Sequence, residues 1–269
     1  MHTSKTGQAA RPNPLLQALE MPRAAAEYAA MVGTAGLFHL APRGDGSHVI
    51  VLPGFTGSDR STLALRKLLG RLGHRPVAWG LGCNIGPTRE ILEGIDTLVQ
   101  RLYDTDGRPI HLVGWSLGGI FARNIAVRRP EMVRRVVTLG SPYRIQGNES
   151  SNAGWVYDLY APLHDAAHEV PHMGPASRPL RVPSTSVYSL TDGIVPWASC
   201  TEPETELAEN VAIHGSHNGL GHNPLAMYVV ADRLALPPGV LPRFEPARAV
   251  RPFFTHGTWP DARQTFTAR

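Results

Sequence analysis

Lysine, cysteine and long apolar runs are all scarce in this chain. Among 269 residues the only lysines are Lys5 and Lys67, so the net charge of +4 comes mostly from scattered arginines. Scattered charge of this kind predicts a solvated surface, and without an RNA- or DNA-binding motif it argues against a nucleic-acid partner. No stretch approaches roughly 18 uninterrupted apolar residues, so we expect no transmembrane segment.

The two cysteines, Cys83 and Cys200, form no metal-binding or redox motif. Sequence alone does not pair them, and both a disulfide and two free buried thiols remain open. The first 14 residues are polar and lack the apolar core of a signal peptide. We therefore expect a cytoplasmic protein, with secretion not excluded, and the sequence indicates no oligomeric state.

Short apolar runs of strand type alternate with helical patterns along most of the chain. Strands are predicted at 48–52, 75–79, 109–113, 132–139, 184–190 and 210–213, and helices at 14–31, 61–72, 87–103, 119–127 and 224–236. This alternation predicts an α/β fold with a mostly parallel central sheet and helices on both of its faces.

The same pattern predicts one domain over residues 14–236 with two flanking segments. Residues 1–13 are expected to form a flexible tail, and the proline-containing residues 237–269 an extension packed on the domain. Residues 141–180 are rich in Gly, Pro, His and aromatics and interrupt the alternation. Because connections of this length are usually functional or mobile, we expect a small cap or loop insertion there.

The most informative motif is G-W-S-L-G at 114–118. It follows a predicted buried strand and precedes a predicted helix, which is the context of a nucleophile elbow. Glycines on either side of Ser116 allow the sharp turn that exposes its hydroxyl. Ser116 is therefore predicted to be a catalytic nucleophile rather than a structural serine in a tight turn.

A serine nucleophile needs a base to accept its proton and a carboxylate to orient that base. After such an elbow, the acid and then the histidine are expected in loops that follow later strands. Asp192 comes directly after a predicted strand and before a glycine turn, so it is the predicted acid. Asp158 and Asp165 have no strand before them and are weaker candidates.

Three histidines compete for the role of base. His214 adjoins the last predicted strand, where it would point into the sheet. His222 lies in a turn that is better suited to starting the final helix, with Asn223 as N-cap and Pro224 at the first helical position. His217 occupies the loop between them and is the predicted base.

An oxyanion hole needs two backbone N–H groups aimed at the developing negative charge. Leu117 follows the nucleophile at the start of its helix and is expected to supply one of them. The other is expected from the turn at 53–57, with Phe55 preferred and Thr56 as the alternative.

The chain resembles the α/β-hydrolases over roughly residues 48–236. It is most similar to compact bacterial lipases and esterases, including those grouped with the GPI inositol-deacylase-like lipases. The resemblance is carried by V-L-P-G-F-T-G at 51–57, G-W-S-L-G-G at 114–119, S-L-T-D-G-I-V-P-W at 189–197 and H-G-S-H-N-G-L-G-H-N-P at 214–224.

This resemblance implies an α/β-hydrolase fold with Ser116, Asp192 and His217 as triad and Phe55 and Leu117 as oxyanion donors. One departure is that the chain has Pro53 where the family usually has histidine before a glycine. The backbone donor is unaffected, because the histidine side chain does not itself donate.

Aromatic residues near the elbow and in the insertion are the candidate substrate contacts. Trp115 is expected either to shape an acyl pocket or to pack against a strand. The aromatic candidates in the insertion, which would line a pocket or form the cap's own small core, are Trp155, Tyr157 and Tyr160. His164 and His168 have metal-ligand spacing but not the H-E-x-x-H motif, so no metal and no cofactor are expected.

These residues predict a serine hydrolase that cleaves carboxylic esters, acting on a small acyl ester or a lipid. An acyltransferase that uses the same acyl-enzyme is the alternative, because this fold hosts several chemistries. A non-catalytic binding module is a third possibility, although a degenerate copy is expected to have lost a triad member.

Overall fold

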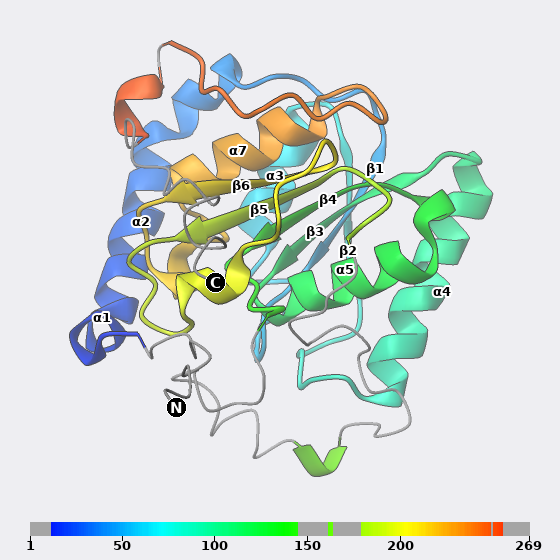
Figure 1. Cartoon of the computed structure of the whole chain (residues 1–269), viewed down its shortest axis with the longest axis horizontal. Coiled ribbons are helices and arrows are strands. Elements are labelled where there is room, and N and C mark those ends of the chain that lie inside the picture. The colour runs from blue at the N-terminus through cyan, green and yellow to red at the C-terminus, as the bar shows by residue number, and fades with distance from the viewer. Residues whose placement is uncertain (1–11, 145–160, 164–178, 249, 255–269) are drawn as a thin grey trace, which may run out of the picture.

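The computed structural model describes residues 12–144, 161–163, 179–248 and 250–254. Six parallel strands form one sheet in the order β2-β1-β3-β4-β5-β6 (Figure 1). The strands are β1 (His48–Leu52), β2 (Arg75–Ala78), β3 (Ile110–Trp115), β4 (Val133–Leu139), β5 (Ser184–Ser189) and β6 (Ala208–Ile213). The predicted α/β fold with a parallel sheet is confirmed.

Helices cover both faces of this sheet. The main helices are α1 (Pro14–Ala18), α2 (Glu20–Thr34), α3 (Leu63–Arg71), α4 (Arg89–Asp106), α5 (Leu117–Arg128) and α7 (Pro224–Leu234). Alternate residues of β1 point to opposite faces: Val49 packs with α3 and α7, and Ile50 packs with α4 and α5. Around β1 both faces of the sheet are therefore apolar, which explains the nearly continuous apolar run of this strand.

The N-terminal helix differs from the prediction of one helix over 14–31. It is broken at Leu19 into α1 and α2, and α2 continues to Thr34. Pro22 gives the physical reason, because it has no N–H to donate to the carbonyl of Ala18 and its ring clashes with that carbonyl. A second segment, a 3₁₀ helix at Ala35–Leu40, follows α2 directly.

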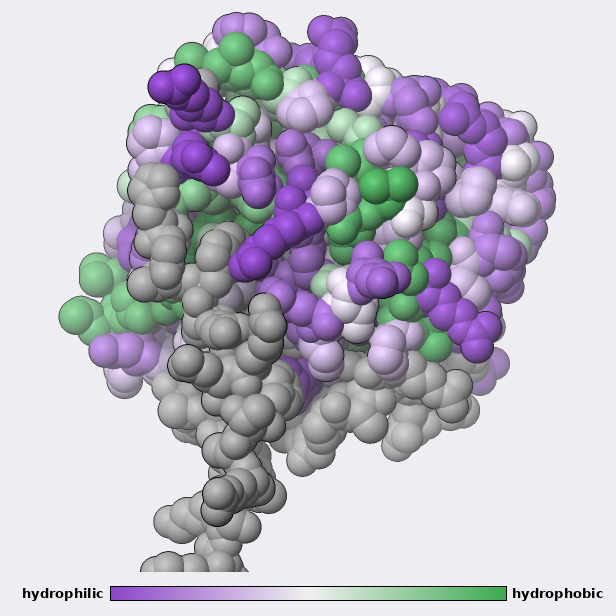
Figure 2. Space-filling model, turned by 45° about the horizontal axis from the view of Figure 1, so that its top comes forward, coloured by the Kyte–Doolittle hydropathy of each residue, from purple (hydrophilic) through white to green (hydrophobic). Residues whose placement is uncertain are grey.

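The N-terminal helices also carry most of the exposed large apolar side chains of the described residues. Figure 2 shows a hydrophobic surface where these helices lie, at the left of the molecule. The exposed residues of this segment are Leu15, Leu19, Met21, Tyr28, Val32, Leu37 and Leu40. Its apolar side chains thus point largely outward.

The described part of the C-terminal segment packs on the domain. Phe244 and Phe254 are buried against Tyr228 of α7, with ring centroids 6.5 and 6.2 Å from that of Tyr228. Most of the predicted insertion at 141–180, residues 1–11 of the predicted tail at 1–13, and residues 255–269 lie outside the described residues. Both thiols are free, with Cys83 exposed and Cys200 buried. Within the described ranges, no helix has the length and apolarity needed to cross a bilayer.

Candidate active site

Ser116 lies in the turn between β3 and α5. Its φ of 50° and ψ of −119° are strained for a residue with a side chain. The flanking glycines let the chain turn this tightly: a Cβ on Gly114 would lie 2.3 Å from the Cα of Gly119, and one on Gly118 would lie 2.4 Å from the carbonyl oxygen of Leu52. The local sequence therefore forces this turn and presents the hydroxyl.

The structure brings Ser116, His217 and Asp192 together, although 101 residues separate the first two. The Ser116 Oγ lies 2.9 Å from Nε2 of His217, and Nδ1 of the same ring lies 2.7 Å from Oδ2 of Asp192. With the proton on Nδ1, the imidazole donates to the carboxylate and can accept the serine proton at Nε2. This is the geometry that a base-activated serine requires.

The Asp192 carboxylate is fixed in place by the loop that carries it. Its Oδ1 accepts hydrogen bonds from the backbone N–H groups of Ile194 and Val195, both at 2.8 Å. The other oxygen is left to His217. Because Asp192 follows β5 and His217 follows β6, two adjacent parallel strands deliver acid and base to the same edge of the sheet.

The electrostatics of His217 favour its charged form. Burial alone would lower the pKa of this imidazole, but the charge and hydrogen bond of Asp192 and the charge of Glu20 outweigh burial. The pKa of His217 is therefore raised above its usual value. The same two carboxylates would stabilise the imidazolium that forms if His217 accepts a proton.

The competing histidines lie elsewhere. His214 is exposed rather than pointing into the sheet, so that expectation is wrong. His222 lies edge-on to Tyr28 and Trp115, and its Nε2 is 3.0 Å from the carbonyl oxygen of Ala24. The predicted N-cap is confirmed, since the Asn223 side chain accepts from two N–H groups of α7.

The two predicted oxyanion donors lie on either side of the elbow. Leu117 is the first residue of α5, where backbone N–H groups have no partner within the helix. Thr56, the alternative to Phe55, already donates its N–H to the carbonyl oxygen of Asn84 at 2.7 Å. This bond favours Phe55 as the second donor.

The polar face of α2 is the part of the site that sequence reasoning missed. Glu20 is buried, and its carboxylate accepts from the N–H groups of Gly193 (2.8 Å), His217 (3.1 Å) and Asn218 (2.9 Å). One carboxylate thus bonds the backbone of both loops that carry the acid and the base. The bonded loop residues are 173 to 198 positions away in the chain, so no local pattern reports them.

Two further residues on the same face of α2 extend this contact. Arg23 donates to the carbonyl oxygen and hydroxyl of Thr191, both at 2.9 Å, and to the carbonyl oxygen of Gly215. Glu27 accepts from the N–H of Ser216 at 2.6 Å. The only sequence signal was the spacing of Glu20, Arg23 and Glu27, which places them on one helical face.

Trp115 is partly buried and packs against the core. Its indole N–H donates to the carbonyl oxygen of His217 at 3.0 Å, and its ring packs against the core under α7. Several other candidates lie outside the described residues: Trp155, Tyr157, Asp158, Tyr160, His164, Asp165 and His168.

One cluster of the described residues has metal-ligand atoms close together. Side-chain atoms of Asp45, His74 and His111 lie within 4.8 Å of one another at the amino ends of the strands, and neither ring nitrogen of the two histidines has a hydrogen-bond partner. The Asp45 carboxylate, however, is held by Arg134 at 2.6 Å and by the Ser47 hydroxyl at 2.6 Å. A guanidinium at this position opposes a cation, so the donor set fits a metal poorly.

Comparisons with known proteins agree with the fold. No known protein-family profile matches the chain. Pimeloyl-[acyl-carrier protein] methyl ester esterase of Aromatoleum aromaticum is 37% identical over 90 residues, which is 31% of this chain and 34% of that protein. The match therefore spans about a third of the length of that curated relative.

Solved structures of esterases and lipases superimpose on the chain. Aspergillus fumigatus lipase B has a TM-score of 0.56 at 17% identity, covering 71% of this chain and 53% of that one. EstE1, a carboxylesterase cloned from a metagenomic library, has a TM-score of 0.53 at 15% identity, covering 73% of this chain and 82% of that one. Bacillus licheniformis lipase BlEst2 has a TM-score of 0.51 at 17% identity, covering 72% of this chain and 94% of that one. At these identities the likeness shows the fold alone: the chain has an α/β-hydrolase fold.

Proposed function

We propose that this chain hydrolyses carboxylic esters through an acyl-enzyme on Ser116. The observation that carries the proposal is the continuous hydrogen-bonded path from the Ser116 hydroxyl through His217 to Asp192. A strained serine at an elbow, a buried base and a fixed carboxylate form the arrangement that activates a hydroxyl at neutral pH. The name of the Aromatoleum relative, a methyl ester esterase, is in keeping with this reaction.

The proposed reaction has two halves. His217 takes the Ser116 proton as Oγ bonds to the ester carbonyl carbon, and the N–H groups of Phe55 and Leu117 stabilise the oxyanion. The carbon–oxygen bond to the alcohol then breaks, and the alcohol leaves with the proton from His217. Water attacks the acyl-enzyme, gives its proton to His217, and the carboxylic acid departs as Ser116 regains a proton.

The test is hydrolysis of p-nitrophenyl esters with acyl chains from about C2 to C16, comparing the wild type with Ser116→Ala. We expect turnover of at least part of the series, lowered by about 10⁴-fold or more in the variant, because the nucleophile is lost. The preferred chain length distinguishes an esterase from a lipase. Equal turnover by both proteins would refute the proposal.

Product analysis distinguishes hydrolysis from acyl transfer. With an added alcohol as competing nucleophile, a hydrolase releases mainly the free acid, whereas an acyltransferase forms mainly the new ester. Chromatographic separation of the two products reports which reaction dominates.

The raised pKa of His217 predicts the pH profile. The base must be neutral to accept a proton, and a raised pKa keeps it protonated up to a higher pH. We therefore expect kcat/KM to fall on acidification with a midpoint above about 6.5, the ordinary value for histidine. The measurement is kcat/KM for a p-nitrophenyl ester at constant ionic strength from about pH 5 to pH 9; a midpoint well below 6.5 would contradict the role of Asp192 and Glu20.

A further inference from the structure

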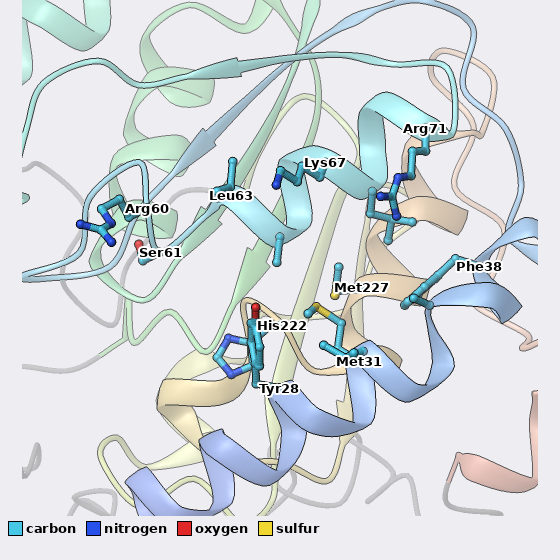
Figure 3. Close-up of a pocket in the computed structure, with 14 residues that line it drawn as sticks. Tyr28, Met31, Phe38, Arg60, Ser61, Leu63, Lys67, Arg71, His222 and Met227 are labelled. Carbon is cyan, nitrogen blue, oxygen red and sulfur yellow. The ribbon is translucent and has the colours of Figure 1, made fainter.

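Helices α2 and α3 enclose a groove of about 490 Å³ (Figure 3). Met31, Phe38, Leu68 and Met227 contribute apolar surface to its lining. A volume of this size falls within the range of pockets that hold small organic ligands. Methionine side chains adapt to irregular apolar partners, which suits a flexible alkyl chain.

The groove is separate from the candidate active site. Its lining does not include Ser116. Tyr28 and His222 belong to the lining and meet edge to face, with ring centroids 5.5 Å apart. His222 in turn meets Trp115, which is not part of the lining, at 6.5 Å. These edge-to-face contacts connect the lining of the groove to Trp115, the residue before Ser116.

The groove carries cations and no carboxylate. Lys67 and Arg71 lie one turn apart on α3, and Figure 3 shows Arg71 pointing from α3 toward Phe38. Neither cation pairs with an acid within the part of the chain that the structure describes. Two acids of adjoining elements have other partners. Glu27 accepts a hydrogen bond from the backbone N–H of Ser216, and Asp59 accepts from the backbone N–H groups of Trp79 and Gly80, directly after β2.

Like charges one helical turn apart repel each other, and among the described residues no acid pairs with either cation to offset that repulsion. An anion bound between Lys67 and Arg71 would remove it. A carboxylate is suited to this position, because charge-assisted hydrogen bonds to ammonium and guanidinium groups are strong. The chemistry of the groove thus combines an apolar floor with a cationic rim.

We propose that this groove is a second ligand site, and that it binds a single-chain anionic amphiphile. The alkyl chain lies on Met31 and Met227, and the carboxylate meets Lys67 and Arg71. The proposal goes beyond the proposed hydrolysis, although its ligand belongs to the class of acid that ester hydrolysis releases. Because α2 forms one wall of the groove while Glu20 and Glu27 of the same helix, on an adjoining face, bond the loops that carry Asp192 and His217, occupancy should also stabilise the contact between α2 and these loops.

The experiment is calorimetric titration of sodium decanoate into full-length protein carrying Ser116→Ala. This background lacks the proposed nucleophile, so the titration does not depend on whether the chain hydrolyses esters. We expect one binding site and a rise in Tm on saturation. The double variant Lys67→Ala/Arg71→Ala should weaken binding by at least about tenfold, because two charge-assisted contacts are lost. Met31→Trp, which fills the groove, should abolish binding.

Matched controls locate the site. Arg101→Ala removes an exposed cation from α4 on the other side of the sheet and should leave decanoate affinity unchanged. Decanol, which has the same chain without the charge, should bind at least about tenfold more weakly. Lys67 and Arg71 are exposed, so their double variant is expected to fold even if Met31→Trp does not. Absence of binding, or equal affinity in the parent and the double variant, would overturn the proposal.

Discussion

Replacing Asp192 with asparagine should lower kcat for ester hydrolysis by about 10⁴-fold while leaving the fold intact. The amide keeps an acceptor for the N–H groups of Ile194 and Val195, but it no longer carries the charge that holds His217 in the productive tautomer. The comparison is steady-state kinetics of wild type and variant, with circular dichroism and Tm as checks on folding.

The matched control for this prediction is Asp104→Asn. Asp104 is an exposed carboxylate on α4 that accepts a hydrogen bond from the Gln100 side chain and lies away from the site. This variant should retain wild-type kcat. A loss of less than about tenfold in Asp192→Asn would show that Asp192 does not orient the base.

Replacing Glu20 with alanine should lower both stability and turnover. The three N–H groups of Gly193, His217 and Asn218 would lose their common acceptor in a buried position. Leaving one such group unsatisfied costs about 1–3 kcal/mol, so for the three groups together we expect the free energy of unfolding to fall by roughly 3–9 kcal/mol. Displacement of the loops should lower kcat by about 10- to 100-fold with a smaller change in KM.

Glu20→Gln distinguishes positioning from simple support of the fold. Glutamine retains an acceptor oxygen but removes the negative charge that helps to raise the pKa of His217. The acid limb of the kcat/KM profile should therefore move to lower pH, with most of the stability retained. Glu93→Ala, an exposed acid on α4, serves as the control. An unchanged pH profile in Glu20→Gln would show that Glu20 has no electrostatic effect on the base.

The strands and the elbow were predictable because their signals are local. Apolar runs bounded by turns located each strand, with boundaries shifted by only a few residues, and the glycines around Ser116 marked the tight turn. The predicted order, an acid and then a histidine, came instead from the pattern expected after such an elbow, with each residue in a loop that follows a strand. Sequence spacing placed Asp192 and His217 at the same edge of the sheet, where the structure has them.

The role of α2 was not predictable, because its partners are far away in the chain. Nothing near Glu20 shows that its carboxylate bonds to the backbone beside His217, 197 residues later. The hydrogen bond from the Thr56 N–H to Asn84, which agrees with the predicted preference for Phe55, likewise joins two different loops and has no local sequence signal. The break at Leu19 was a missed local signal, because Pro22 stands inside the predicted helix.

The most direct test of the central claim is labelling with a fluorophosphonate, followed by peptide mapping. If Ser116 is activated by His217, the wild type should be labelled once, on Ser116. Labelling should be absent in Ser116→Ala and slowed by about 10³-fold or more in His217→Ala, which lacks the base. An unlabelled wild type, or equal labelling of Ser116 with and without His217, would contradict the account.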